Sequence, residues 1–152
     1  PSAIKAAEIA REFSIPIVAD LEDNDDDSFN QLLTLVDHLI ISSTFAQKIS
    51  GCLDPKSAME KLWDSNKEFL SVTIGEDGCW YRYSGDPEIY HQPAFNVPVE
   101  NTTGCGDVFH GAYALALAKG LPVSDRVKIA SASAALKVRR AKLTMPATCR
   151  SS

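Results

Sequence analysis

Residues 101–120 read NTTGCGDVFHGAYALALAKG, a glycine turn that leads directly into a run of small and apolar residues. Such a run is typical of a packed helix, which places the turn at the helix N-terminus. A helix N-terminus presents unpaired backbone N–H groups and a positive dipole end, and glycines before it let an anion approach closely. The stretch therefore predicts an anion cradle. Asp107 is unexpected there, because its carboxylate would repel a bound phosphate.

The position of Asp107 makes chemical sense if its carboxylate faces a nucleophile while the backbone N–H groups of residues 104–106 face a phosphoryl group. A hydroxyl held between them would lose its proton to Asp107 and attack in line. The simpler interpretation is that Asp107 only stabilises the first helical turn. Other glycine motifs fit less well. There is no G-x-x-x-x-G-K-[ST], and Phe109 stands where a dinucleotide-binding fingerprint needs its third glycine.

Upstream of this turn, helical and strand patterns alternate three times. The helical segments are 1–13, 28–37 and 54–65, and the strand segments that follow them are 14–21, 38–42 and 69–75. Asp54 and Pro55 suit the N-cap and first turn of the third helix. The apolar positions of the first helix are Ile4, Ala7, Ala10 and Phe13. This alternation predicts an α/β fold with a mostly parallel sheet flanked by helices.

The pattern changes after residue 75. Residues 76–95 contain short strands joined by Gly and Pro turns, and GEDG at 75–78 predicts a hairpin. Two helices follow: the first ends at Gly120, and the second runs from a Ser124 cap to about Arg140. The predicted apolar face of the first is Val108, Phe109, Ala112, Leu115 and Ala116. Because no repeat or linker interrupts the chain, we expect a single domain over residues 1–152.

Composition indicates an ordinary globular domain, with 45% hydrophobic and 23% charged residues and no apolar run near the roughly 20 residues of a membrane span. The net charge is −5, but it is unevenly distributed: residues 1–120 carry −11 and residues 121–152 carry +6. That basic end either faces phosphates or forms a solvated helix face, and its lack of aromatics argues against nucleic acid. The acidic run at 22–27 has the character of a solvated loop rather than a cation site.

The four cysteines lie at least 26 positions apart, so no C-x-x-C pair indicates zinc or a redox dithiol. Free thiols and the absence of a visible targeting segment favour a cytoplasmic protein. The sequence opens at Pro1 inside a helical pattern and lacks an initiator Met. We therefore expect a piece of a longer protein.

The motifs around Asp107 resemble the second signature of the ribokinase-like (PfkB) carbohydrate kinases, usually written D-T-x-G-A-G-D-x-F. Residues 101–109 read NTTGCGDVF. Residues 70–83, LSVTIGEDGCWYRY, are similar to that family's T-x-G-x-x-G strand and hairpin, which borders the nucleotide. The closing ASASAALKVRRAKLTMP also matches. The resemblance implies the C-terminal part of a ribokinase-like three-layer fold, incomplete in this chain, that transfers a phosphoryl group from ATP to a hydroxyl of a sugar or related molecule.

Carried over by position, the resemblance implies roles for seven site residues and for two residues of the turn. Asp107 is the catalytic base and contacts the substrate hydroxyl. The anion hole is Gly104, Cys105 and Gly106, and the nucleotide-binding positions are Thr73, Gly75 and Gly78. Asn101 and Thr103 are expected to shape the turn.

The implied cofactors are ATP and Mg²⁺, with a monovalent cation as a further option. The implied partner is a sugar or sugar-like small molecule, with no nucleic acid and no membrane, and a homodimer through the lid of the missing half is left open. We expect the isolated chain to be inactive, because the part that would hold the acceptor is missing. Two alternatives also stay open: a nucleoside kinase of the same fold, and a non-catalytic, truncated nucleotide-binding relative.

The sequence departs from the family pattern at several positions. Asn101 replaces the commoner Asp, and Cys105 replaces Ala. The N-x-x-E motif that helps to organise magnesium is absent, since Ser42 and Phe45 occupy its Asn and Glu positions. How Mg²⁺ would be held is therefore left open.

Several further residues invite a functional role but have a simpler one. Cys105 fits as a small residue at an Ala site, and His110 fits as a packing or exposed imidazole rather than a group that tunes Asp107. Trp63 and Trp80 fit as packing residues, with Trp80 a candidate for the nucleotide border. Three basic residues either reach phosphates or keep the helix end soluble: Arg139, Arg140 and Lys142.

Overall fold

The computed structural model describes residues 2–22 and 28–139. They form one five-stranded sheet of order β1-β2-β3-β4-β5. The first three strands pair in parallel, and the last two are added antiparallel. The strands are β1 (Val18–Asp20), β2 (His38–Ser42), β3 (Phe69–Thr73), β4 (Cys79–Tyr83) and β5 (Asp86–Gln92).

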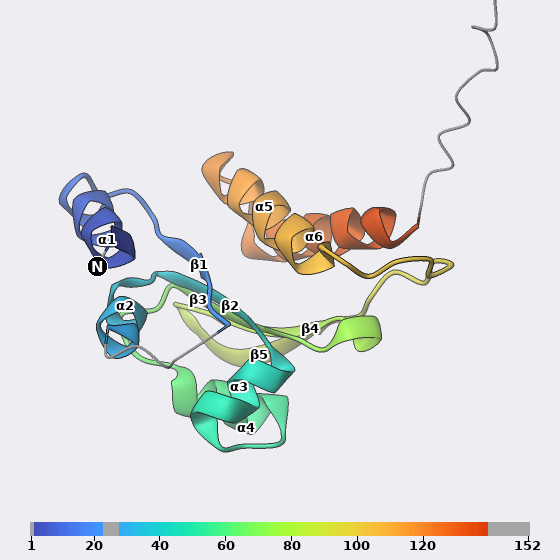
Figure 1. Cartoon of the computed structure of the whole chain (residues 1–152), viewed down its shortest axis with the longest axis horizontal. Helices are drawn as coiled ribbons and strands as arrows, with labels where there is room; N and C mark the ends of the chain where they lie inside the picture. Colours follow the sequence, from blue (N-terminus) through green and yellow to red (C-terminus); the bar gives the residue numbers. More distant parts are fainter. Residues whose placement is uncertain (1, 23–27, 140–152) are drawn as a thin grey trace, which may run out of the picture.

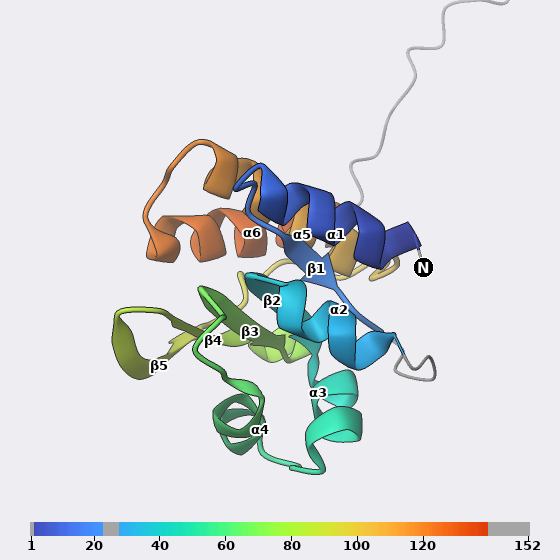
Figure 2. The ribbon, with the colours of Figure 1, turned by 90° about the vertical axis from the view of Figure 1, so that its left-hand side faces the viewer.

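Helices cover both faces of this sheet (Figure 1). One face carries α5 and α6, and α1 lies on the same side; the other carries α2, α3 and α4 (Figure 2). The helices are α1 (Ser2–Glu12), α2 (Phe29–Leu35), α3 (Ser43–Ser50), α4 (Pro55–Leu62), α5 (Cys105–Ala118) and α6 (Val123–Val138). The predicted α/β class with helices flanking the sheet is confirmed. The strands reached through helices are the parallel ones, whereas the tight turns after β3 and β4 can only reverse the chain.

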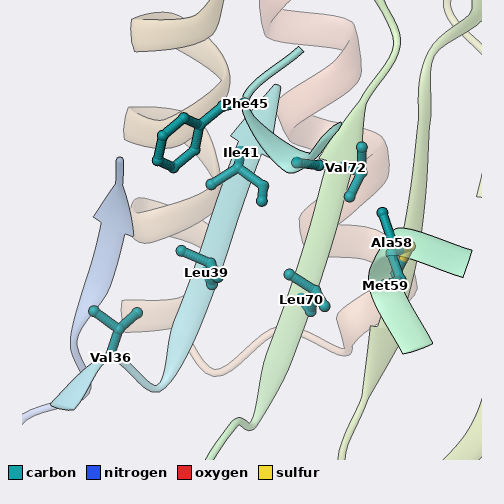
Figure 3. Close-up of a cluster of buried hydrophobic side chains, with 9 residues drawn as sticks. Val36, Leu39, Ile41, Phe45, Ala58, Met59, Leu70 and Val72 are labelled. Atoms are coloured by element: carbon teal, nitrogen blue, oxygen red, sulfur yellow. The ribbon is translucent and has the colours of Figure 1, made fainter. Parts of the chain in front are cut away.

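The core on the α3 and α4 side is aliphatic (Figure 3). Leu39 and Ile41 of β2 and Leu70 and Val72 of β3 point to this face, as the two-residue period of a strand requires. They meet Phe45 of α3 and side chains of α4. The full cluster is Val36, Leu39, Ile41, Phe45, Ala46, Ala58, Met59, Leu70 and Val72.

The core under α5 and α6 is rich in aromatic rings. Tyr113 of α5 stacks on Phe69 of β3 with ring centroids 4.5 Å apart, and both side chains are fully buried. The tyrosine hydroxyl lies 3.0 Å from Nδ1 of the buried His38, which satisfies a polar group that burial would otherwise penalise. Because this core ties α5 to β2 and β3, it fixes where the N-terminus of α5 lies over the sheet.

Local signals predicted most helix boundaries correctly. The Asp54 carboxylate accepts a hydrogen bond from the Ser57 N–H at 2.9 Å, with Pro55 in the first turn, so the predicted cap is confirmed. The GEDG hairpin is also confirmed, as a short 3₁₀ turn, η1 (Gly75–Asp77), between β3 and β4. The Ser124 cap is wrong. The helix begins at Val123 after Pro122, whose fixed φ already suits the position, and no side chain caps it.

Two predicted apolar positions are also wrong. Leu115 is 58% exposed, because the buried stripe of α5 follows Phe109, Tyr113 and Ala116. Phe13 is 68% exposed, since α1 ends at Glu12 and the chain turns away. The helix α3 was not predicted, and its eight residues are too few for a clear period.

No helix within the described ranges is long and apolar enough to cross a membrane. Most of the acidic run, together with Arg140, Lys142 and Cys149, lies outside the described residues.

Candidate nucleotide and general-base site

The turn before α5 is built by Asn101 and Gly104. The Asn101 side-chain oxygen accepts a hydrogen bond from the Thr103 N–H at 2.8 Å, which closes the turn locally. Gly104 has φ +76°, a left-handed conformation that costs glycine little. Its carbonyl accepts the first helical bond, from the Val108 N–H at 3.1 Å. The sequence therefore places the N-terminus of α5 through a turn that asparagine and glycine favour.

The backbone N–H groups of residues 104–106 are not equivalent. The Cys105 N–H donates to the Thr102 carbonyl at 3.2 Å. The N–H groups of Gly104 and Gly106 have no hydrogen-bond partner among the residues that the structure describes. Two donors of the predicted anion hole are thus available, and an anion would have to compete with the Thr102 carbonyl for the third.

Asp107 lies exposed in the first turn of α5 and folds back toward the glycine turn. Its Oδ2 atom is 3.7 Å from the point where a β-carbon on Gly104 would stand. The Cε atom of Lys137, in the last turn of α6, is 3.8 Å from the same point. Lys137 was not singled out from the sequence, although it belongs to the same basic segment as Arg139.

A histidine and a second carboxylate lie close to the start of α5. His110 contacts the Gly106 carbonyl through Nδ1 at 2.7 Å and the Ile40 carbonyl of β2 through Nε2 at 3.0 Å. The same Nδ1 is 3.4 Å from Oδ2 of Asp20, the last residue of β1. Burial raises the pKa of Asp20; His110 opposes this rise, whereas Asp107 adds to it. Two carboxylates that repel one another therefore lie near the start of α5: Asp107 in its first turn and Asp20 at the end of β1.

The predicted nucleotide-binding positions lie on β3 and the turn after it. Thr73 ends β3, and its hydroxyl donates to the Ile41 carbonyl of β2 at 3.4 Å. Gly75 and Gly78 have φ values of +64° and +97°. A β-carbon on Gly75 would meet nothing within 4 Å, whereas one on Gly78 would run into the backbone of residues 92–94. Gly78 is required by the fold itself.

Both predicted sets lie near the carboxyl end of β2. His110 binds the carbonyl of Ile40, and Thr73 binds that of the next residue, Ile41. The carboxyl ends of the parallel strands β1, β2 and β3 form one edge of the sheet, where open α/β folds bind their ligands.

The residues at the N-x-x-E positions have structural roles. The Ser42 hydroxyl accepts a hydrogen bond from the Phe45 N–H at 3.1 Å and so caps α3. Phe45 is 4% exposed and belongs to the aliphatic core. Within the described part of the chain, no group of three or more His, Cys, Asp or Glu residues could hold a metal ion. These residues do not fit a metal site of their own.

Both tryptophans pack, as predicted. Trp63 lies against the Arg82 guanidinium at 4.5 Å. Trp80 lies between Lys56, whose ammonium is 4.1 Å from the ring centroid, and His91, whose ring is 4.4 Å away. Trp80 packs against the aliphatic core, on the face of the sheet opposite α5.

Comparison with known sequences adds the family. The profile of the pfkB family of carbohydrate kinases matches residues 2–148. A 2-dehydro-3-deoxygalactonokinase of Haloferax volcanii is 39% identical over 83 residues, which are 55% of this chain and 26% of that protein. A ribokinase of Lactococcus lactis is 33% identical over 89 residues, 58% of this chain and 29% of the relative.

Solved structures agree with the sequence relatives. A candidate ribokinase from Agrobacterium tumefaciens superposes with a TM-score of 0.83 at 29% identity, covering 91% of this chain and 45% of that one. Arabidopsis thaliana ribokinase, solved with ribose and ATP, gives a TM-score of 0.81 at 24% identity over 91% of this chain and 46% of its own. The chain thus spans less than half the length of these relatives, and its fold is ribokinase-like. On the match of nearly every residue to the family profile, the chain belongs to the pfkB family of carbohydrate kinases.

Proposed function

We propose that this chain is the C-terminal, nucleotide and general-base part of an ATP-dependent sugar kinase, with Asp107 as the base. The observation that carries the proposal is the start of α5. There a carboxylate shares one turn with the N–H groups of Gly104 and Gly106, for which no described residue is a hydrogen-bond acceptor. Those N–H groups suit phosphoryl oxygens, and the carboxylate suits a hydroxyl that must lose its proton.

In the proposed reaction, an acceptor hydroxyl lies between Asp107 and the γ-phosphorus of ATP. Its oxygen forms a new bond to phosphorus as the bond from the γ-phosphorus to the β,γ-bridging oxygen breaks, and ADP leaves. The hydroxyl proton passes to the Asp107 carboxylate. The N–H groups of Gly104 and Gly106 donate to the oxygens of the transferring group, where negative charge is concentrated.

The nucleotide would lie along the carboxyl edge of the sheet, beside Thr73, Gly75 and the α5 turn. Lys137 adds a positive charge close to Gly104, which favours phosphates there. Mg²⁺ is implied by family membership alone, and no step of the proposed reaction is assigned to it.

The acceptor is proposed to be a sugar or a related polyol. The support is the family and relatives such as the Haloferax volcanii 2-dehydro-3-deoxygalactonokinase and the Lactococcus lactis ribokinase. The remainder of the family fold has a surface to join. No described strand pairs with the outer edge of β1, and Ile9 of α1 and Ile15, which precedes β1, are 45% and 56% exposed. Because that remainder would hold the acceptor, the 152-residue chain alone should show little sugar phosphorylation.

Nucleotide binding can be tested on the chain itself. We expect a non-hydrolysable ATP analogue to shift the backbone amide NMR signals of residues 73–78 and 104–107. Shifts confined to residues 1–50 would contradict the proposed site.

The role of Asp107 requires a protein with both halves of the family fold, such as a longer product of the same reading frame. Asp107→Asn keeps the side-chain size and removes its basicity. Turnover should fall by roughly 10²- to 10⁴-fold, the usual weight of general-base catalysis. ATP affinity should hold or rise slightly as the repulsion is removed. Near-normal turnover would remove Asp107 from the mechanism and leave it as a helix stabiliser.

A further inference from the structure

His110 is surrounded by groups that can only accept hydrogen bonds. Nδ1 faces the Gly106 carbonyl at 2.7 Å and the Asp20 carboxylate at 3.4 Å, and Nε2 faces the Ile40 carbonyl at 3.0 Å. A neutral imidazole carries one N–H, so its second nitrogen would direct a lone pair at an oxygen. Only the doubly protonated ring donates on both sides.

These contacts join three elements at one point. Gly106 belongs to the first turn of α5, Ile40 to β2 and Asp20 to the end of β1. Asp20 and Ile40 are register partners, so the histidine spans the last pair of the β1–β2 ladder. The side chain of His110 is 16% exposed; its contact with the Ile40 carbonyl is partly buried, whereas its contact with the Gly106 carbonyl is exposed.

We propose that protonated His110 is a positioning residue that locks the first turn of α5, with Asp107 and the Gly104 and Gly106 N–H groups, onto the carboxyl edge of the sheet. The inference rests on the proposed function for its catalytic consequence, but not for its structural content. His110 does not touch the reacting atoms. It sets where the base and the anion donors stand relative to the strands that border the nucleotide.

The charged groups around His110 influence how its hydrogen bonds to α5 and β2, which we call the lock, respond to pH. Asp20 faces it from β1, and Asp107 lies one turn earlier on α5. Glu22 lies close to Asp20, and Lys137 of α6 approaches Gly104. When both ring nitrogens are protonated, the ring donates to both α5 and β2. When rising pH removes one proton, one of these hydrogen bonds is lost.

The structural test uses the 152-residue chain and needs no activity. The ring nitrogens of His110 are followed by ¹⁵N NMR across pH, together with the amides of residues 104–110. We expect both nitrogens to be protonated on the acid side, and the α5 amides to shift with the same midpoint as the ring. A ring that holds one proton throughout, or α5 amides that ignore its titration, would overturn the inference.

Two variants separate the lock from simple packing. His110→Phe keeps a ring and removes every donor, and should speed amide exchange in the first turn of α5 about tenfold, the ratio expected for roughly one net hydrogen bond. His110→Gln keeps a donor that does not titrate, so exchange should be intermediate and the pH-dependent shifts should vanish. His91→Gln is the matched control for exchange, because the His91 ring, far from α5 in sequence, has the Asp77 carbonyl and the Trp80 ring as its partners among the described residues. Unchanged exchange in His110→Phe would refute the lock.

The catalytic consequence is tested in the protein with both halves. We expect kcat of the unsubstituted protein to decline as rising pH removes the His110 proton. His110→Gln should lower kcat about tenfold with little change in KM for ATP, and should abolish that decline. An intact alkaline decline in this variant would refute the positioning role. If Asp107→Asn retains turnover, the proposed function fails whatever His110 does. If Asp107→Asn loses turnover while the ¹⁵N titration shows no coupling of His110 to α5 and His110→Phe leaves amide exchange unchanged, only the positioning role of His110 fails.

Discussion

Replacing Gly78 by Ala should destabilise the chain far more than the same change at Gly75, three residues earlier in the same turn. Gly78 has φ +97° and ψ −126°, a conformation that residues with a β-carbon rarely adopt. An added β-carbon would stand 2.6 Å from the Ala94 nitrogen and 2.8 Å from the Pro93 carbonyl carbon, and closer still to the Gln92 carbonyl oxygen. Gln92 pairs with Cys79 in the β4–β5 ladder, so the backbone cannot retreat without breaking that pairing.

The magnitude follows from comparing the two positions. Gly75 is left-handed at φ +64° with nothing within 4 Å, so Gly75→Ala should cost only the conformational term, about 1–2 kcal/mol. Gly78→Ala adds the overpacking of a site that backbone atoms already fill, about 1–3 kcal/mol. The sum, about 2–5 kcal/mol, is a large part of the 5–15 kcal/mol that stabilises a typical domain.

Urea unfolding of both variants, followed by circular dichroism and Trp fluorescence, measures the difference directly. We expect Gly78→Ala to lower the midpoint two to three times as far as Gly75→Ala, with amide NMR shifts concentrated in residues 78–94. Equal losses in the two variants would show that the contact with residues 92–94 relaxes freely, and the structural role of Gly78 would be refuted.

Burial lowers the pKa of His38 below its ordinary value of about 6.5. At a pH between the lowered pKa of the folded chain and 6.5, the unfolded chain therefore holds more protons than the folded one. Stability should therefore decline as pH falls below about 6.5, and His38→Gln should flatten this decline in urea titrations at pH 5 and 7; an unchanged slope would contradict it. Burial raises the pKa of the Cys79 thiol to about 11. Iodoacetamide at pH 8 should therefore modify the half-buried Cys52 and spare Cys79 until the chain unfolds. Equal rates of alkylation of the two thiols in the native state would contradict this expectation. Lys67 is 1% exposed and donates to the Leu33 carbonyl at 2.7 Å. Lys67→Met should lower the free energy of unfolding by about 1–3 kcal/mol, because it leaves that carbonyl unpaired. An unchanged free energy in urea unfolding would show that water replaces the ammonium.

The sequence alone predicted those structural features that depend only on residues adjacent in the chain. The alternation of helix and strand segments, the Asp54 cap and the glycine turns around residues 75–78 and 104 each follow from local backbone preferences, and the structure confirms them. The family signature around Asp107 is also local, so it predicted the family before any fold was known, and the profile match confirmed it. The roles of the individual site residues stay predictions.

Tertiary structure decided what depends on residues that are distant in the chain. Leu115 fits an apolar helix face by its spacing, but α5 is rotated by the stack of Tyr113 on Phe69 and leaves it exposed. The contact of His110 with Ile40 joins residues 70 positions apart, and the approach of Lys137 to Gly104 depends on how α6 packs against α5. No local preference encodes such contacts, because their geometry is set by how the side chains of several elements fill one shared core.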